Sequence, residues 1–192
     1  FSRGSSSNIL TITVANPETF TQAVTSPEQY NLLRVRTGGW SNFFTSVFPV
    51  IQDQIGIFGH SMGGHGALTL ALKYPEKFKS VSAFAPICAP SQCPWGEKAF
   101  SNYLGDDRGV WKQHDATALI EQKGALFAEI LIDQGLDDQF YSQLNPDLFE
   151  QACHKVGQKL SLRQHAGYDH GYYFIQSFMD DHLQFHAVQL KS

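Results

Sequence analysis

The chain is poor in cysteine, and its few cysteines form no recognisable pattern. Among 192 residues only Cys88, Cys93 and Cys153 are present. An odd number cannot all pair within one chain, and their spacing matches no close-set zinc motif. We therefore expect free thiols in a reducing, cytoplasmic compartment, with no metal or other cofactor.

Long apolar runs and an excess of positive charge are also missing. No stretch reaches the roughly 18 consecutive apolar residues of a membrane-spanning helix. Fourteen basic and 18 acidic side chains give a formal net charge of −4, which argues against nucleic acid or an anionic membrane as a partner. The 42% of apolar residues, 15 phenylalanines among them, instead predict one compact domain over residues 1–192.

Strand-type and helix-type segments alternate along the chain. This alternation predicts an α/β fold with a mostly parallel sheet and helices on both faces. Strands are expected at 8–15, 32–36, 55–58, 79–85, 128–133 and 159–164, and helices at 41–51, 62–73, 146–156 and 172–190. The proline- and glycine-rich stretch 89–111 is expected to be a loop lying over the site.

The segment 57–67, IFGHSMGGHGA, carries the most informative motif. It contains Gly59-x-Ser61-x-Gly63 between a predicted strand and a predicted helix. That context is typical of a nucleophile elbow, in which a sharp turn strains the serine backbone and the flanking positions must be glycine. We expect Ser61 to be a catalytic nucleophile rather than part of an ordinary glycine-rich turn.

A serine nucleophile needs a base to take its proton and an acid to orient that base. In the α/β-hydrolase arrangement both follow the serine along the chain, the acid first, each after a strand. Asp137 and Asp138 follow the predicted strand 128–133, and either could be the acid or simply a solvated turn residue.

His170 is the expected base, because it lies between the last predicted strand and the last predicted helix. His182 and His186 have metal-ligand spacing on a helix, but no glutamate completes an HExxH motif, so a partly exposed helix face is expected there. His60 and His65 belong to the elbow and are expected to be satisfied locally. His170 would take the Ser61 proton during attack on an ester or thioester carbonyl.

The developing oxyanion also needs hydrogen-bond donors. The backbone N–H of Met62, at the start of the helix after the elbow, is the expected first donor. The segment that would contain a second donor is not recognisable in the sequence.

From about Ile57 onward the sequence resembles the esterase D family of α/β-hydrolases, the S-formylglutathione hydrolases. The runs that carry this resemblance are FGHSMGGHGAL (58–68), SVSAFAPIC (80–88), CPWGEKAF (93–100), IDQGLDDQF (132–140) and GYDHGYYFI (167–175). The resemblance places Ser61, Asp138 and His170 at the family's triad positions, and so favours Asp138 over Asp137. It implies cofactor-free hydrolysis of S-formylglutathione to glutathione and formate in cytoplasmic formaldehyde detoxification, and frequent homodimerisation.

Residues 1–50 do not match this family, whose members are longer and whose amino-terminal part supplies several strands and the second oxyanion donor. The sequence begins with Phe1 rather than methionine. We expect the amino-terminal part of the fold to be incomplete or divergent, with omission of a stretch of a longer chain as the favoured explanation.

Two other functions compete with the thioesterase hypothesis. A general short-chain carboxylesterase or acyltransferase would use the same triad, with Trp95, Phe100 and Tyr172 either narrowing an acyl pocket or packing in the core or a lid. A non-catalytic hydrolase-like scaffold is favoured only by the missing second donor, because loss of one such donor typically lowers kcat by ~10²–10³-fold.

Overall fold

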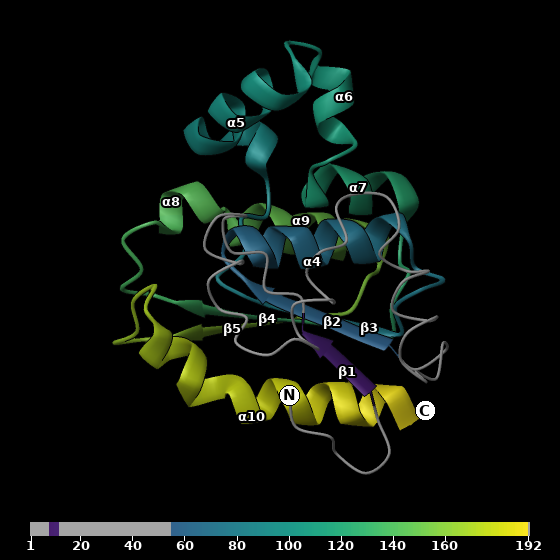
Figure 1. The fold of residues 1–192 in the computed structure, drawn as a ribbon, viewed down its shortest axis with the longest axis vertical. Coiled ribbons are helices and arrows are strands. Elements are labelled where there is room, and N and C mark those ends of the chain that lie inside the picture. Colours follow the sequence, from purple (N-terminus) through teal and green to yellow (C-terminus); the bar gives the residue numbers. More distant parts are fainter. Residues whose placement is uncertain (1–7, 12–54, 192) are drawn as a thin grey trace, which may run out of the picture.

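Five strands form one parallel sheet. The computed structural model describes residues 8–11 and 55–191 of the chain. In this part the strands lie side by side in chain order (Figure 1), as β1 (Asn8–Thr11), β2 (Ile55–His60), β3 (Ser80–Phe84), β4 (Ile130–Gly135) and β5 (Leu160–His165). Every neighbouring pair is parallel, so the carboxyl ends of the strands meet at one edge. This confirms the predicted α/β class and parallel sheet.

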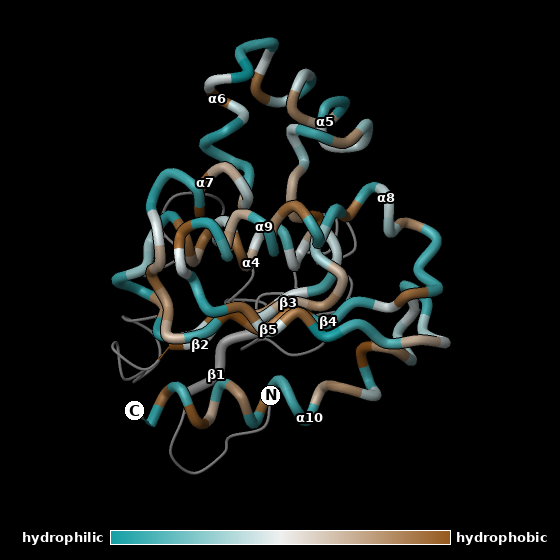
Figure 2. Tube along the Cα trace, turned by 180° about the vertical axis from the view of Figure 1, so that it is seen from behind, coloured by the Kyte–Doolittle hydropathy of each residue, from teal (hydrophilic) through white to brown (hydrophobic). Residues whose placement is uncertain are grey.

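Helices cover both faces of the sheet, because parallel neighbours need crossover connections and a parallel sheet buries both faces. On one face lie α4 (Met62–Lys73), α7 (Ala116–Lys123) and α9 (Pro146–Val156), and on the other lies α10 (Tyr172–Lys191) (Figure 1, and from behind in Figure 2). Beyond the α4 layer, α5 (Pro94–Leu104) and α6 (Arg108–Lys112) project away from the sheet. Two shorter helical segments are the 3-10 turn η1 (Pro90–Gln92) and α8 (Tyr141–Leu144).

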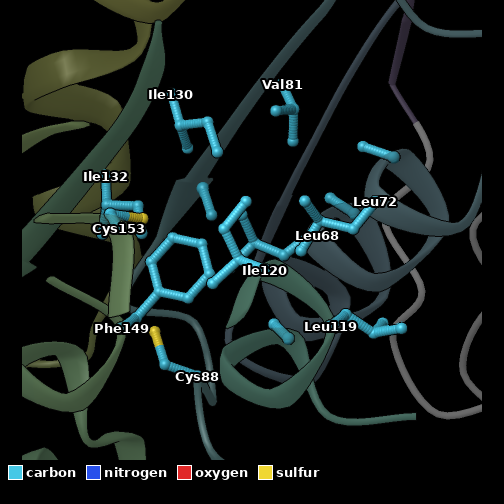
Figure 3. Close-up of a cluster of buried hydrophobic side chains, with 14 of the residues drawn as sticks. Leu68, Leu72, Val81, Cys88, Leu119, Ile120, Ile130, Ile132, Phe149 and Cys153 are labelled. Carbon is cyan, nitrogen blue, oxygen red and sulfur yellow. The ribbon is translucent and has the colours of Figure 1, made fainter. Parts of the chain in front are cut away.

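Two apolar clusters hold these layers together. The larger fills the space between the sheet and α4, α7 and α9, where Leu68, Ile130 and Phe149 are buried together (Figure 3). A smaller cluster includes Phe84 of β3 and Phe174 of α10, whose rings meet edge to face at 5.9 Å. Because full burial of such a side chain is favourable by roughly 1.5–3 kcal/mol, the clusters make the sheet a firm support for the loops at its edge.

Between residues 55 and 191 the expected strands and helices are confirmed within two residues at each end. The helices expected at 62–73 and 146–156 begin and end at those residues. The strand expected at 128–133 is shifted, and runs from Ile130 to Gly135. The first expected strand is described as β1, and the remaining amino-terminal expectations lie outside the described residues: 12–15, 32–36 and 41–51.

The prediction of a loop at 89–111 is wrong, because its proline and glycine residues begin and end helices. Pro94 is the first residue of α5, and Gly105 ends that helix with φ 78°. Asp107 then caps α6 by accepting a hydrogen bond from the Gly109 N–H. Proline suits the first helical turn, where its missing N–H is not needed, and glycine readily adopts positive φ at the end.

Candidate active site

Ser61 lies in the tight turn between β2 and α4. Its backbone has φ 55° and ψ −118°, which is strained for a residue with a Cβ. Glycine is required at position 59, because a Cβ there would lie 2.3 Å from the Gly63 carbonyl oxygen. The Ser61 N–H donates to the Phe84 carbonyl at 2.9 Å, and the Ser61 carbonyl accepts from the His65 N–H at 2.9 Å. These bonds hold the serine at the carboxyl edge of the sheet.

Met62 is the first residue of α4. The first N–H groups of a helix have no intrahelical acceptor, and the helix dipole makes this end positive. The Met62 N–H therefore lies directly after Ser61 at the positive end of α4, and its role as an oxyanion donor stays a prediction. Its side chain is exposed, and the role of the residue would lie in the backbone.

Asp138 and His170 form a close pair after the ends of β4 and β5. His170 Nδ1 lies 2.6 Å from Asp138 Oδ2, and the Asp138 side chain is fully buried. An ionised carboxylate only accepts hydrogen bonds, so Nδ1 carries the proton and Nε2 is left as the basic nitrogen. Asp137 is exposed, and its backbone N–H donates to the Tyr168 carbonyl at 3.0 Å. The structure thus brings Asp138, rather than Asp137, to His170.

Two further groups hold the Asp138 carboxylate. The Phe140 N–H donates to Oδ1 at 2.8 Å, and the Gln134 side-chain amide donates to Oδ2 at 3.1 Å. Sequence reasoning missed both residues, although Gln134 stands out as an amide at the end of an apolar strand. With His170, these donors fully engage a carboxylate that water does not reach.

Two rings fix the orientation of the His170 imidazole and place it beside the elbow. The His60 ring lies 4.5 Å away between centroids, and the Phe140 ring meets the imidazole edge to face at 5.1 Å. Since His60 directly precedes Ser61, this contact brings the expected base to the nucleophile turn. Burial lowers the pKa of His60 to about 4, and positive charge on His170 acts in the same direction. His60 is therefore neutral at neutral pH.

The expectation that the elbow histidines are satisfied locally is wrong for one nitrogen of each ring. His60 Nε2 and His65 Nδ1 are buried without a hydrogen-bond partner among the described residues. Burial lowers the pKa of His65 to about 4 as well. Each ring also interacts with a backbone group, His60 with that of His170 and His65 with that of Ile87, and makes an aromatic contact, His60 with His170 and His65 with Phe100 at 6.4 Å.

The expectation of a partly exposed face at His182 and His186 is also wrong. Both side chains are fully buried between α10 and the sheet. His186 Nδ1 lies 2.6 Å from Ser80 Oγ, and Ser82 Oγ lies 2.8 Å from both His186 Nε2 and His182 Nδ1. Burial lowers the pKa of His186 to about 3. These bonds attach α10 to β3, and helical spacing alone does not reveal which face the sheet covers.

An ion cluster around the buried Asp133 joins the elements on either side of the Asp138 and His170 loops. The Arg163 guanidinium donates two hydrogen bonds of 2.5 Å to Asp133, and a third of 2.7 Å to Asp181. Burial by itself would raise the pKa of Asp133, but hydrogen bonds and charge from His182 and Arg163 outweigh it and lower the value to about 2. The cluster links β4, β5 and α10.

The three aromatic residues considered for an acyl pocket lie in different surroundings. Phe100 is buried, and its ring centroid lies 5.9 Å from that of Trp111, so this residue packs in the core. Trp95 is partly exposed, with its ring 4.8 Å from that of Phe140. Tyr172 is largely exposed at the start of α10. Through Phe140, Trp95 is one contact away from the His170 ring.

Two further features bear on cofactors and membranes. Over residues 8–11 and 55–191, no group of three or more histidine, cysteine or acidic side chains is arranged to hold a metal ion. No helix in the same part is long and apolar enough to cross a membrane.

Known proteins resemble this chain over most of its described part. The family model described as "Putative esterase" matches residues 40–185. An S-formylglutathione hydrolase of Arabidopsis thaliana is 59% identical over 136 residues, which are 70% of this chain and 48% of that protein. One of Rattus norvegicus is 54% identical over 147 residues, 76% of this chain and 52% of that protein.

A solved structure agrees with this likeness. It is an S-formylglutathione hydrolase from Agrobacterium tumefaciens, with a TM-score of 0.76 and 52% identity over 80% of this chain and 56% of that one. The chain thus spans about half the length of the curated relatives it matches.

Proposed function

Because this chain belongs to the esterase family and has the α/β-hydrolase fold, we propose that it acts as a serine thioesterase that hydrolyses S-formylglutathione to glutathione and formate. The observation that carries the chemistry is the partly buried pair of His170 Nδ1 and Asp138 Oδ2, 2.6 Å apart, beside the strained turn at Ser61. The substrate is supported by the relatives, which are named S-formylglutathione hydrolases.

In the acylation step, His170 Nε2 takes the proton of the Ser61 hydroxyl while Oγ bonds to the thioester carbonyl carbon. The carbonyl oxygen becomes an oxyanion, which accepts a hydrogen bond from the Met62 N–H. Asp138 stabilises the imidazolium through Nδ1–H. When the C–S bond breaks, the thiolate receives the proton from His170, and glutathione leaves a formyl group on Ser61.

Deacylation repeats these transfers with water as the nucleophile. His170 takes a proton from water, whose oxygen attacks the formyl carbon, and the new oxyanion returns to the same donor. Breakage of the C–Oγ bond releases formic acid, which ionises to formate in water, while the proton passes from His170 back to Ser61 Oγ. The triad is restored without any cofactor.

A comparison of two substrates tests the substrate assignment. The purified protein should show a higher kcat/KM for S-formylglutathione than for 4-nitrophenyl acetate, and Ser61→Ala should abolish both activities. Equal values, or a preference for the acetyl ester, would make the protein a general carboxylesterase instead.

A covalent probe tests whether the triad is active at all. A fluorophosphonate should label Ser61, which mass spectrometry of the peptide would locate, and His170→Gln should suppress the labelling. Folded protein that remains unlabelled at Ser61 would indicate a non-catalytic scaffold.

We further propose that the protein acts in the cytoplasm, a reducing compartment, because Cys88, Cys93 and Cys153 are all free and buried. Burial raises the pKa of the Cys153 thiol to about 12, which keeps it protonated and unreactive.

A homodimer is the assembly that the family resemblance implies, and light scattering on the purified protein would test it.

A further inference from the structure

We propose that Gln134 is a positioning residue for the general base, acting through the carboxylate of Asp138. Its amide donates to the same oxygen, Oδ2, that holds the Nδ1–H of His170. In this way Gln134 would limit how strongly Asp138 stabilises the imidazolium, and so set the pH range over which His170 can act as a base. The inference rests on the proposed function, because it takes His170 as the base for Ser61.

The position of Gln134 is fixed by the sheet. The residue lies near the carboxyl end of β4, which has β3 on one side and β5 on the other, and its side chain is completely buried. Nε2 donates to the Gly135 carbonyl at 3.0 Å and to Asp138 Oδ2 at 3.1 Å. Rotating the amide by 180° would place an oxygen against both acceptors, so the geometry determines which atom faces the carboxylate.

This arrangement is costly for the fold. Gln134 Oε1 is buried without a hydrogen-bond partner among the described residues. A buried polar atom without a partner destabilises a protein, and an apolar side chain of similar length would avoid that cost. The amide is thus poorly explained by stability, whereas its contact with Asp138 gives it a role.

Gln134 is also the one side chain, besides His170, that donates to Asp138 within the described part of the chain. The other donor is the Phe140 backbone N–H, which binds Oδ1 at 2.8 Å. A donor on Oδ2 disperses negative charge that would otherwise act on the imidazolium. Without it, the carboxylate would attract positive charge on His170 more strongly, and His170 would be protonated up to a higher pH.

The groups around the base allow this effect to be measured separately. The titratable side chains placed against the His170 ring are Asp138 from the loop after β4 and His60 from β2. Within the base's own loop, the Asp169 carboxylate accepts from the Gly171 N–H at 2.8 Å. Burial lowers the pKa of His60 to about 4, so this ring is neutral at neutral pH.

The test is the pH profile of kcat/KM in the natural protein and in Gln134→Met, a variant of similar shape without a donor. We expect the acidic limb to move to higher pH by about 0.5 unit, with KM nearly unchanged. Gln158→Met is the matched control, since Gln158 is also buried but its amide bonds only backbone groups of the 126–127 and 159 region. It should lower stability and leave the limb in place.

A second measurement needs no substitution and no turnover. In the NMR spectrum of the natural protein, the side-chain amide resonances of Gln134 should shift as His170 titrates, because both groups share Oδ2. Amide resonances that do not follow this titration, or a folded Gln134→Met with an unchanged acidic limb, would overturn the proposal. An inactive natural protein would instead refute the proposed function, and the NMR titration would still decide the role of Gln134.

Discussion

Asp138 and Asp137 carry the same group, but only the Asp138 carboxylate is buried against His170. Asp138→Asn would place an amide beside Nδ1 and favour the tautomer with the proton on Nε2, which cannot accept the Ser61 proton. We expect kcat to fall about 10⁴-fold, as for removal of the orienting charge in other serine hydrolases. Asp137→Asn is the control and should keep nearly full kcat, because its side chain is exposed. A similar loss in both variants would contradict the assignment of Asp138.

The strained turn at Ser61 depends on what surrounds residue 59. In Gly59→Ala the new Cβ would lie 2.3 Å from the Gly63 carbonyl oxygen, so backbone rather than a flexible side chain must move. Because a displacement of about 1 Å can lower a rate 10²-fold, we expect a loss of kcat of about that size together with a lower Tm. In Gly109→Ala the Cβ would meet only the Asp107 carboxylate at 3.0 Å, and activity should persist. Unchanged kcat in Gly59→Ala would show that the elbow tolerates rearrangement.

Among the elements, β4, β5 and α10 depend on the buried cluster around Asp133. Arg163→Met would leave that carboxylate buried without its guanidinium partner. We expect the free energy of unfolding to fall by about 3 kcal/mol, the lower end for a broken buried pair, because the Arg163 side chain is one-third exposed. Urea denaturation would measure it. Lys155→Met breaks the exposed pair with Glu121 and should cost less than about 1 kcal/mol. Equal costs would mean that the Asp133 cluster does not stabilise these elements.

The boundaries of the elements could be predicted where the signals are local. Helix α4 begins after the elbow and ends at Lys73 as expected, because its apolar period and the following Tyr74-Pro75 are both visible in the sequence. The proline and glycine residues of 89–111 led to the wrong prediction of a loop, since these residues mark the ends of helices as well as loops. The burial of His182 and His186 could not be predicted, because the neighbouring sheet decides which helix face is covered.

At the scale of the whole molecule, stability should depend on the charge state of the buried histidines. Burial lowers the pKa of His186 to about 3, and that of His60 and His65 to about 4. Each folded-state pKa lies below the unfolded value of about 6.5. The free energy of unfolding is therefore highest above that pH, and it decreases as the pH falls towards the folded-state pKa, because only the unfolded chain can bind these protons. Asp133 changes the free energy of unfolding only as the pH falls below its unfolded pKa of 3.8, since its folded pKa is about 2.

We therefore expect the free energy of unfolding to decrease from pH 7 to pH 5. His186→Gln keeps a partner for Ser80 and Ser82 but cannot be protonated, so it should reduce this decrease by about 2 kcal/mol. Urea denaturation at both pH values would measure the difference, with the exposed His154 replaced by Gln as a control. A His186→Gln variant with the same pH dependence as the unsubstituted protein would assign the effect to other groups.

The sequence by itself determined the α/β class, the glycine elbow around Ser61, and the chain order in which Ser61, an acidic pair and His170 each follow a strand. These features follow from the spacing of apolar residues, the residue types in turns and the order of segments along the chain, all of which can be read from the sequence. Only the tertiary structure brought His170 to Asp138 across 32 residues, placed Gln134 on the same carboxylate and buried His182 and His186. Such contacts join segments far apart in the chain, so their partners depend on how strands and helices pack. The elbow motif predicts where a nucleophile can stand, and the packing decides which groups surround it.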